Sequence, residues 1–421
     1  MSRLTRRAIA VPVLVCLAVL SVGCGSDDDA TPASTDAPST AAPASSEAST
    51  PETTAAPETT EASESTTPDS TAAPESTAPE SNMVEGCENG LPADFAVDPD
   101  SSPARCEPGF PAPVPLAERQ TITYSTSSLS SENSFPMLLA IDQGEFEKEN
   151  IEVNIEVLPT PDQMQLLAEG EVDLSSNYSA ALFNLVQAGF PITIPVAGNY
   201  SSAESKDGLW ATTGTELADF KGKTLAASVV STNAFYGAWR LMNEAGVSIQ
   251  DINVLQVGQI QETVIALQNG AADAAFAIAP FWAELDAEPD KYQFLAPFFP
   301  LGEPGAGLIF GSRLAEPENE ELAAAILRAY VRTVSTYFAE GDWKTRPEML
   351  EHGARILGIP AETLALTPGT ILDYVHRDGT IQRTQEMFRD AGALDYEPAD
   401  DIPEGDIIRR DLLEMVLTKQ E

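Results

Sequence analysis

From Thr121 onward, short apolar runs alternate with amphipathic stretches. The first run is followed by a Ser-rich turn, an amphipathic segment and a second apolar run, and the same order continues along the chain. Apolar runs of this length are typical of strands, and the amphipathic stretches are typical of helices. Strands that alternate with helices predict an α/β protein with largely parallel sheets.

Two segments of the chain are similar at an offset of one hundred residues. The stretches "SENSFPMLLAID" and "STNAFYGAWRLM" share Ser, Asn and Phe at matching positions. The same offset relates Gly170 to Gly270 and Asp173 to Asp273, where a predicted helix ends at a glycine and a buried strand follows. Two β-α-β-α-β copies predict two similar lobes. Chance similarity between generic βαβ units is the alternative, because each shared signal is weak by itself.

The first 24 residues predict an export signal. A basic stretch precedes an apolar run at residues 8–22, which is too short and wrongly flanked for a membrane span. The run ends in "LSVGC", which resembles a bacterial lipoprotein processing site, although Ser21 stands where that family usually has Leu. A lipidated Cys24 would hold the protein at the outer face of the cytoplasmic membrane. The alternative is an ordinary secretion signal in which Cys24 is incidental.

Residues 25–82 consist mainly of Ser, Thr, Ala, Pro and acidic residues. Such a composition cannot bury enough apolar surface to fold, so it predicts a disordered, semi-extended tether. Residues 83–119 are rich in Pro and contain Cys87 and Cys106. In an exported protein this pair favours a disulfide that staples an irregular extension, with two free thiols as the alternative.

Charge and His content exclude several classes of function. The net charge of −42 argues against nucleic acid, because phosphate binding requires Lys and Arg. The only two His, His352 and His376, leave little room for a His-based metal site or a Ser-His-Asp triad. We therefore expect no cofactor and no metal.

Five segments carry a resemblance to type II periplasmic binding proteins, of the branch that serves nitrate, sulfonate, taurine and thiamine-pyrimidine ABC importers. They are "STSSLSSENSFPMLLAIDQGEFEKENIEV", "LLAEGEVDLSSNYSAALFNLVQAG", "LADFKGKTLAASVVSTNAFYGAWRLMNEAGV", "ALQNGAADAAFAIAPF" and "GAGLIFGS". The resemblance implies an α/β fold with two lobes, each a mainly parallel sheet flanked by helices, joined by a hinge that the chain crosses twice. Lobe 1 would comprise residues 120–200 and 305–421, and lobe 2 residues 201–304.

The resemblance also implies a function. Such a protein is an extracytoplasmic receptor that binds a small polar or anionic sulfur or nitrogen compound between its lobes and delivers it to an ABC permease. We expect a monomer without enzymatic activity. The pyrimidine-forming relatives use His and a Cys-rich stretch, whereas residues 120–340 contain neither residue type. A surface sensor or adhesin and a non-transport enzyme are the alternatives on the same fold.

Polar turns that follow strands and precede helices are the expected ligand contacts, because ligands lie beyond the carboxyl ends of the strands in open α/β sheets. In lobe 1 the candidates are Ser127, Ser128, Asn133, Asn177, Tyr178 and Ser179. In lobe 2 they are Ser231, Thr232, Asn233, Pro280, Phe281 and Trp282. For the Ser and Asn residues at helix starts the alternative is simple N-capping, and Trp282 could instead pack under the hinge.

Glu132 lies at a predicted helix start, where the second copy has Thr. Facing the cleft, its carboxylate would disfavour a bare anion and suit a ligand with an amine or a ring N–H. The other interpretation is a charge that is turned to solvent and favourable to the helix dipole.

Overall fold

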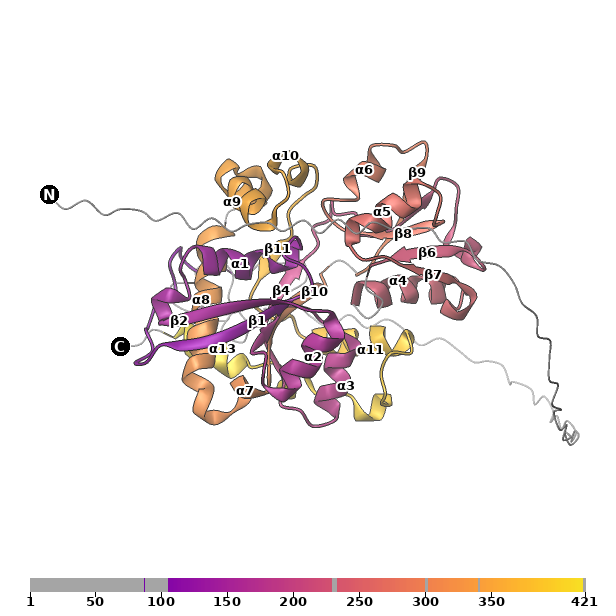
Figure 1. Ribbon diagram of the computed structural model, residues 1–421. Coiled ribbons are helices and arrows are strands. Elements are labelled where there is room, and N and C mark those ends of the chain that lie inside the picture. Colours follow the sequence, from indigo (N-terminus) through magenta and orange to yellow (C-terminus); the bar gives the residue numbers. More distant parts are fainter. Residues whose placement is uncertain (1–86, 88–104, 229–232, 300–301, 340, 419–421) are drawn as a thin grey trace, which may run out of the picture. The chain divides into compact units, whose positions relative to one another are not determined.

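The computed structural model describes residue 87 and residues 105–228, 233–299, 302–339 and 341–418. These residues form two β-sheets with helices packed against each, as Figure 1 shows. We call the six-stranded sheet with its helices lobe 1, and the five-stranded sheet with its helices lobe 2. The two-lobed α/β fold expected from the sequence is confirmed.

Lobe 1 takes its strands from two separate parts of the chain. They are β1 (Gln120–Thr126), β2 (Ile151–Val157), β3 (Leu174–Ser175), β4 (Thr193–Tyr200), β10 (Pro304–Phe310) and β11 (Ile371–Asp373). Their order across the sheet is β11-β4-β10-β3-β1-β2. Strand β1 pairs in parallel with β2 and β3, whereas β10 and β11 run antiparallel to their neighbours.

Lobe 2 is built from one continuous part of the chain. Its strands are β5 (Gly208–Thr212), β6 (Thr224–Ala227), β7 (Asn253–Gln256), β8 (Ala274–Ala277) and β9 (Tyr292–Pro297). They lie in the order β7-β6-β8-β5-β9, with β6 parallel to β7 and β8, and β5 antiparallel to β8 and β9.

The sheets are therefore mixed, and parallel pairing is limited to three strands of each. The chain leaves lobe 1 through β4 and returns through its neighbour β10, and it enters and leaves lobe 2 through the neighbours β5 and β9. Entering and leaving through adjacent strands requires those strands to run in opposite directions. Most strands of each sheet still run in one direction, with only β10 and β11 reversed in lobe 1 and only β5 reversed in lobe 2, so the expectation of mainly parallel sheets is confirmed.

The helices pack against both sheets. In lobe 2 they are α4 (Asn233–Glu244), α5 (Ile260–Gln268) and α6 (Ala283–Asp286). The helices before the crossing are α1 (Phe135–Asp142), α2 (Thr160–Glu169) and α3 (Ala180–Gln187). Those after the return are α7 (Ser312–Ala315), α8 (Glu320–Tyr337), α9 (Pro347–Leu357), α10 (Ala361–Leu364), α11 (Thr380–Asp390), α12 (Glu404–Ile407) and α13 (Arg410–Leu417).

The internal repeat is confirmed in the backbone. Strands β2-β1-β3 and β7-β6-β8 have the same order and direction. Gly170 and Gly270 both adopt positive φ, 76° and 77°, after α2 and α5. The Asp173 carboxylate accepts a hydrogen bond from the Thr123 amide, and the Asp273 carboxylate accepts one from the Thr224 amide, each at 2.8 Å. The shared Gly-x-x-Asp thus ties the third strand of each copy to the first.

The segment before β1 is held to lobe 1 by buried charges. The Leu116 amide donates to the carbonyl of Glu149 at 3.0 Å, and the Val114 amide donates to its carboxylate at 3.1 Å. Arg332 of α8 donates to the carbonyl of Pro111 and forms an ion pair with Glu149 at 2.8 Å. Cys87 and Cys106 are both buried in the core of lobe 1.

The C-terminal region adds to lobe 1 and also reaches lobe 2. Strand β11 extends the sheet beside β4, and α9 packs on α1. Helix α11 packs on α3 of lobe 1 and on α4 of lobe 2.

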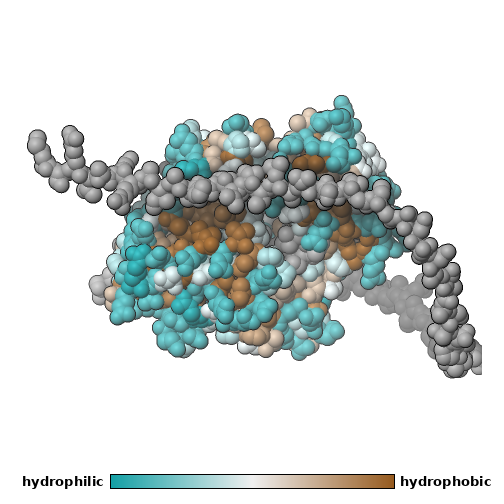
Figure 2. Space-filling model, viewed as in Figure 1, coloured by the Kyte–Doolittle hydropathy of each residue, from teal (hydrophilic) through white to brown (hydrophobic). Residues whose placement is uncertain are grey.

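On the face seen in Figure 2, hydrophilic residues lie mostly toward the rim and hydrophobic residues toward the middle.

The export signal at residues 1–24, Cys24 and the tether at residues 25–82 lie outside the described residues, as does most of the segment 83–119. In the part of the chain that is described, none of the helices combines the length and the apolar character that crossing a membrane requires.

Candidate functional site

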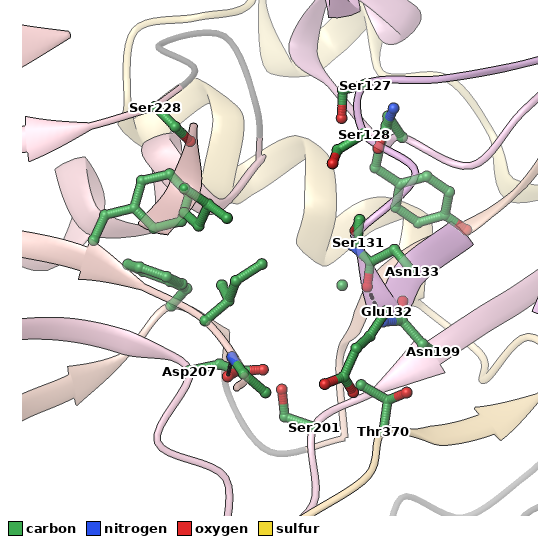
Figure 3. A pocket seen from close by; sticks show the side chains of 18 of the residues that line it. Ser127, Ser128, Ser131, Glu132, Asn133, Asn199, Ser201, Asp207, Ser228 and Thr370 are labelled. Atoms are coloured by element: carbon green, nitrogen blue, oxygen red, sulfur yellow. Dashed lines mark hydrogen bonds between the residues drawn. The ribbon is translucent and has the colours of Figure 1, made fainter. Parts of the chain in front are cut away.

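A cavity of about 150 Å³ lies between the two lobes, at the ends of β1, β3, β6 and β8 (Figure 3). On the lobe 1 side it is lined by Ser127, Ser128, Ser131, Glu132, Asn133, Asn177, Tyr178, Asn199, Gly305 and Thr370. On the lobe 2 side it is lined by Ser228, Gly258, Gln259, Ile260, Phe276, Ile278 and Ala279. Ser201, Asp207, Phe298 and Phe299 line it from the segments that cross between the lobes. This is where ligands lie in open α/β folds.

The turn after β1 is shaped by its own hydroxyl groups. Thr126 and Ser134 share a hydrogen bond of 2.5 Å between their hydroxyl oxygens, and the Ser134 hydroxyl donates to the carbonyl of Ser128 at 3.2 Å. Ser131 precedes a short 3-10 helix and makes no capping hydrogen bond with its side chain. The turn thereby presents Ser127, Ser128 and Ser131 to the cavity.

The turn after β3 divides the predicted residues between the cavity and the core. Asn177 lines the cavity and donates to the side chain of Gln163 at 3.0 Å. Tyr178 lines it with a buried ring. Ser179 does not line it, because its hydroxyl accepts a hydrogen bond from the Leu182 amide and caps α3. N-capping is therefore the role of Ser179 in this structure.

The predicted residues of lobe 2 do not line the cavity where the structure describes them. Ser231 and Thr232 lie outside the described residues, and Asn233 is described only by its backbone at the start of α4. Pro280, Phe281 and Trp282 follow the lining residue Ala279 without lining the cavity themselves. The buried Trp282 indole packs on Trp210, with a ring-centroid distance of 6.3 Å.

Of the twelve candidates, Ser127, Ser128, Asn133, Asn177 and Tyr178 are therefore brought together in the cavity. Their contact with a ligand stays a prediction.

Glu132 is buried and lines the cavity, which corrects the interpretation of a solvent-facing charge. Its Oε1 lies 2.5 Å from the Nζ of Lys344, which also donates to the hydroxyl of Thr367 at 2.9 Å. Burial, together with the nearby Asp207 and Asp342, raises the pKa of Glu132 to about 7, although Lys344 acts in the opposite direction. Its Oε2 has no hydrogen-bond partner among the described residues.

Asp207 is a second carboxylate of the cavity, and the sequence analysis did not identify it. Its Oδ1 accepts hydrogen bonds from the Ala279 amide at 2.7 Å and from the Trp282 indole N–H at 2.9 Å. Burial raises the pKa of Asp207, and these two hydrogen bonds act in the opposite direction. Trp282 thus positions a cavity residue instead of contacting the cavity.

Asn199 is a further residue that the sequence analysis missed. Its side-chain amide donates to the side-chain oxygen of Asn133, which joins β4 to the turn after β1. The Oδ1 of Asn199 is buried and has no partner among the described residues. The available signal in the sequence was an Asn within the mainly apolar run "TIPVAGNY".

The family model described as NMT1/THI5 like matches residues 131–340. No curated protein matches the sequence at the significance required.

Solved structures of periplasmic binding proteins are similar in fold. The periplasmic aliphatic sulphonate binding protein from Escherichia coli is 17% identical, with a TM-score of 0.52 over 70% of this chain and 93% of that one. The periplasmic nitrate-binding protein from Synechocystis PCC 6803 is 14% identical, with a TM-score of 0.54 over 72% of this chain and 89% of that one. These matches confirm the resemblance to the type II branch that was identified from the sequence motifs.

Proposed function

Because the chain has the two-lobed fold of type II periplasmic binding proteins, we propose that it is the extracytoplasmic solute-binding receptor of an ABC importer. The observation that carries the proposal is the cavity, which both lobes and both crossing segments line. A small polar compound bound there would contact both lobes at once. It would therefore favour the closed arrangement, since a ligand shifts an equilibrium toward the state that it contacts better.

The connection between the lobes supports a hinge. Residues 201–207 lead from β4 to β5, and residues 298–303 lead from β9 back to β10. The Phe298 amide donates to the carbonyl of Asp207 at 3.3 Å, so the two segments lie side by side. Hinge closure by a few residues between lobes is a common way to enclose a ligand. Because Asp207, Phe298 and Phe299 also line the cavity, binding and hinge motion would be coupled directly.

The proposal includes an anchor and a partner. Cys24 would carry lipid, residues 25–82 would form the tether, and Cys87 and Cys106 would form a disulfide in the oxidising environment outside the cytoplasm. A monomer would deliver its ligand to the permease of the importer. No chemical step on the ligand is required. A surface sensor or adhesin remains the second candidate, and it would use the same fold to bind a partner protein instead of delivering a solute to a permease.

The test is thermal unfolding of the full chain in detergent with a panel of small polar solutes. A solute at about 100 times its Kd should add roughly 2.7 kcal/mol to the free energy of unfolding, which corresponds to a midpoint several degrees higher. The control is Gly305→Leu. A Cβ at Gly305 would lie 3.7 Å from the Phe299 ring and 3.8 Å from Asn199 Oδ1, so the longer side chain fills the cavity without a backbone clash.

A shift that Gly305→Leu abolishes would support the receptor. A shift that persists in the variant would place binding elsewhere and contradict it. Chemical conversion of the solute during incubation would favour the enzyme alternative. A folded chain that no solute stabilises would favour the sensor or adhesin.

A further inference from the structure

The oxygen atoms of the cavity that lack partners point to the chemistry of the ligand. Glu132 Oε2 and Asn199 Oδ1 have no hydrogen-bond partner among the described residues, and their residues are only 5% and 8% exposed. Both atoms are hydrogen-bond acceptors. A buried acceptor without a donor is costly, so a ligand that supplies donors would be stabilised at both atoms.

The charges of the cavity favour the same kind of ligand. Among the described residues that line it, none is Lys, Arg or His, whereas two are carboxylates. Lys344 does not line the cavity and pairs with Oε1 of Glu132, whereas Oε2 is buried and has no hydrogen-bond partner among the described residues. In Figure 3 the side chains of Glu132 and Asp207 lie on facing sides of the lower end of the pocket, near Ser201 and Thr370. An oxyanion placed there would lie next to two carboxylates, of which Glu132 is paired with Lys344, so Asp207 would supply most of the repulsion.

The opposite wall indicates an apolar part of the ligand. Ile260, Phe276 and Ile278 line the cavity from lobe 2, and Phe298 and Phe299 line it from the return crossing. Apolar and aromatic walls with a few placed polar groups are typical of small-molecule sites. The volume of about 150 Å³ is comparable to that of a cavity that holds a benzene-sized molecule.

We propose that the ligand is a small nitrogen compound with N–H donors, neutral or positively charged, with an apolar body about the size of a single ring. Its N–H groups bind Glu132, Asn199 and Asp207, and its apolar face lies against lobe 2. This inference rests on the proposed receptor function. The proposed ligand differs from the sulphonate and nitrate for which the similar structures are named.

The experiment uses three probes of nearly the same shape and different charge, namely benzamidine, benzamide and benzoate. Their Kd values for the full chain are measured by calorimetry in detergent at pH 8. The salt concentration is about 0.3 M, where the Debye length is shorter than about 10 Å and the field of distant charges is screened. We expect benzamidine to bind about tenfold more tightly than benzamide, because hydrogen bonds to a charged partner are stronger. Benzoate should not bind measurably.

Two variants locate the effect. Glu132→Gln together with Lys344→Met removes both charges of the buried pair, so neither is left uncompensated and the fold is kept. In this double variant benzamidine binding should weaken by about tenfold to a hundredfold, and benzamide binding by less than about threefold. Asp162→Asn is the matched control, because Asp162 is an exposed carboxylate outside the cavity. It should leave all three Kd values unchanged.

Tighter binding of benzoate than of benzamidine, abolished by Gly305→Leu, would overturn the ligand class and leave the receptor function standing. Benzamidine binding that the double variant does not weaken would also overturn the inference. If none of the three probes binds, the inference fails. The solute panel described above then decides separately whether the receptor function fails with it.

Discussion

Replacing Arg332 with Met is expected to lower the free energy of unfolding by about 3–5 kcal/mol. Arg332 is buried in α8 and pairs with Glu145 at 2.7 Å and with Glu149 at 2.8 Å. It also donates to the carbonyl oxygens of Pro111 and Glu145. Met fills much of the same volume but leaves the buried Glu149 with only Arg328 as counter-charge and the buried Glu145 with only the half-exposed Lys148. Removing one partner from a buried cluster of charges in this way is far more costly than losing a surface pair.

Urea unfolding at pH 7 measures this effect. The matched control is Arg119→Met, because the Arg119–Glu152 pair is more than half exposed on both sides. It should change stability by less than about 1 kcal/mol. Similar losses in the two variants would show that the buried cluster does not hold the segment before β1 to lobe 1. The variant Arg332→Met should also expose this segment to proteolysis, whereas Arg119→Met should not.

The second large effect is a dependence of stability on pH that originates at Glu132. Its pKa is about 7 in the folded protein, above the ordinary value of 4.5, so the folded state binds the proton more tightly than the unfolded state. The resulting stabilisation is fully present below pH 4.5 and is lost as pH rises through 7. At about 1.4 kcal/mol per pKa unit, the loss amounts to about 3 kcal/mol.

The reference protein is the double variant Glu132→Gln with Lys344→Met, in which this carboxylate cannot titrate. From pH 4.5 to pH 8, wild-type stability should fall by about 3 kcal/mol relative to the variant. Lys344 lowers the pKa of Glu132, and Asp207 and Asp342 raise it. Burial lowers the pKa of His376 to about 3, so both proteins lose stability as this residue becomes protonated in acid. The loss is the same in both and cancels in the comparison. A constant difference across this range would contradict the assignment.

The repeated part of the fold could be predicted because its signals are local. A glycine with positive φ and an aspartate three residues later recur in each copy, and both aspartates make the same hydrogen bond to the first strand. The crossing strands do not belong to the repeat. Their antiparallel direction follows from where the chain leaves and re-enters each sheet, and no short sequence pattern encodes that.

The sequence identified residues of the cavity only where a turn directly after a strand fixes the position of the side chain. Ser127 and Ser128 follow β1 directly, so their place follows from the strand. The orientation of Glu132 depends on Lys344, which is 212 positions away in the sequence. Trp282 was predicted as a ligand contact because of its aromatic ring. Its indole N–H instead donates a hydrogen bond to Asp207, which lies in the segment between β4 and β5. Such partners can be found only when the tertiary structure is known.

The order of strands in lobe 1 has a consequence for how the chain is assembled during synthesis. Strand β10 lies between β4 and β3, so the first four strands cannot form one sheet until residue 310 has been made. All five strands of lobe 2 are complete at Pro297. A nascent chain that ends there would have one finished sheet and one that is still split. We therefore expect lobe 2, whose strands are continuous in the sequence, to fold first. The sheet of lobe 1 should be completed last, although the chain begins it.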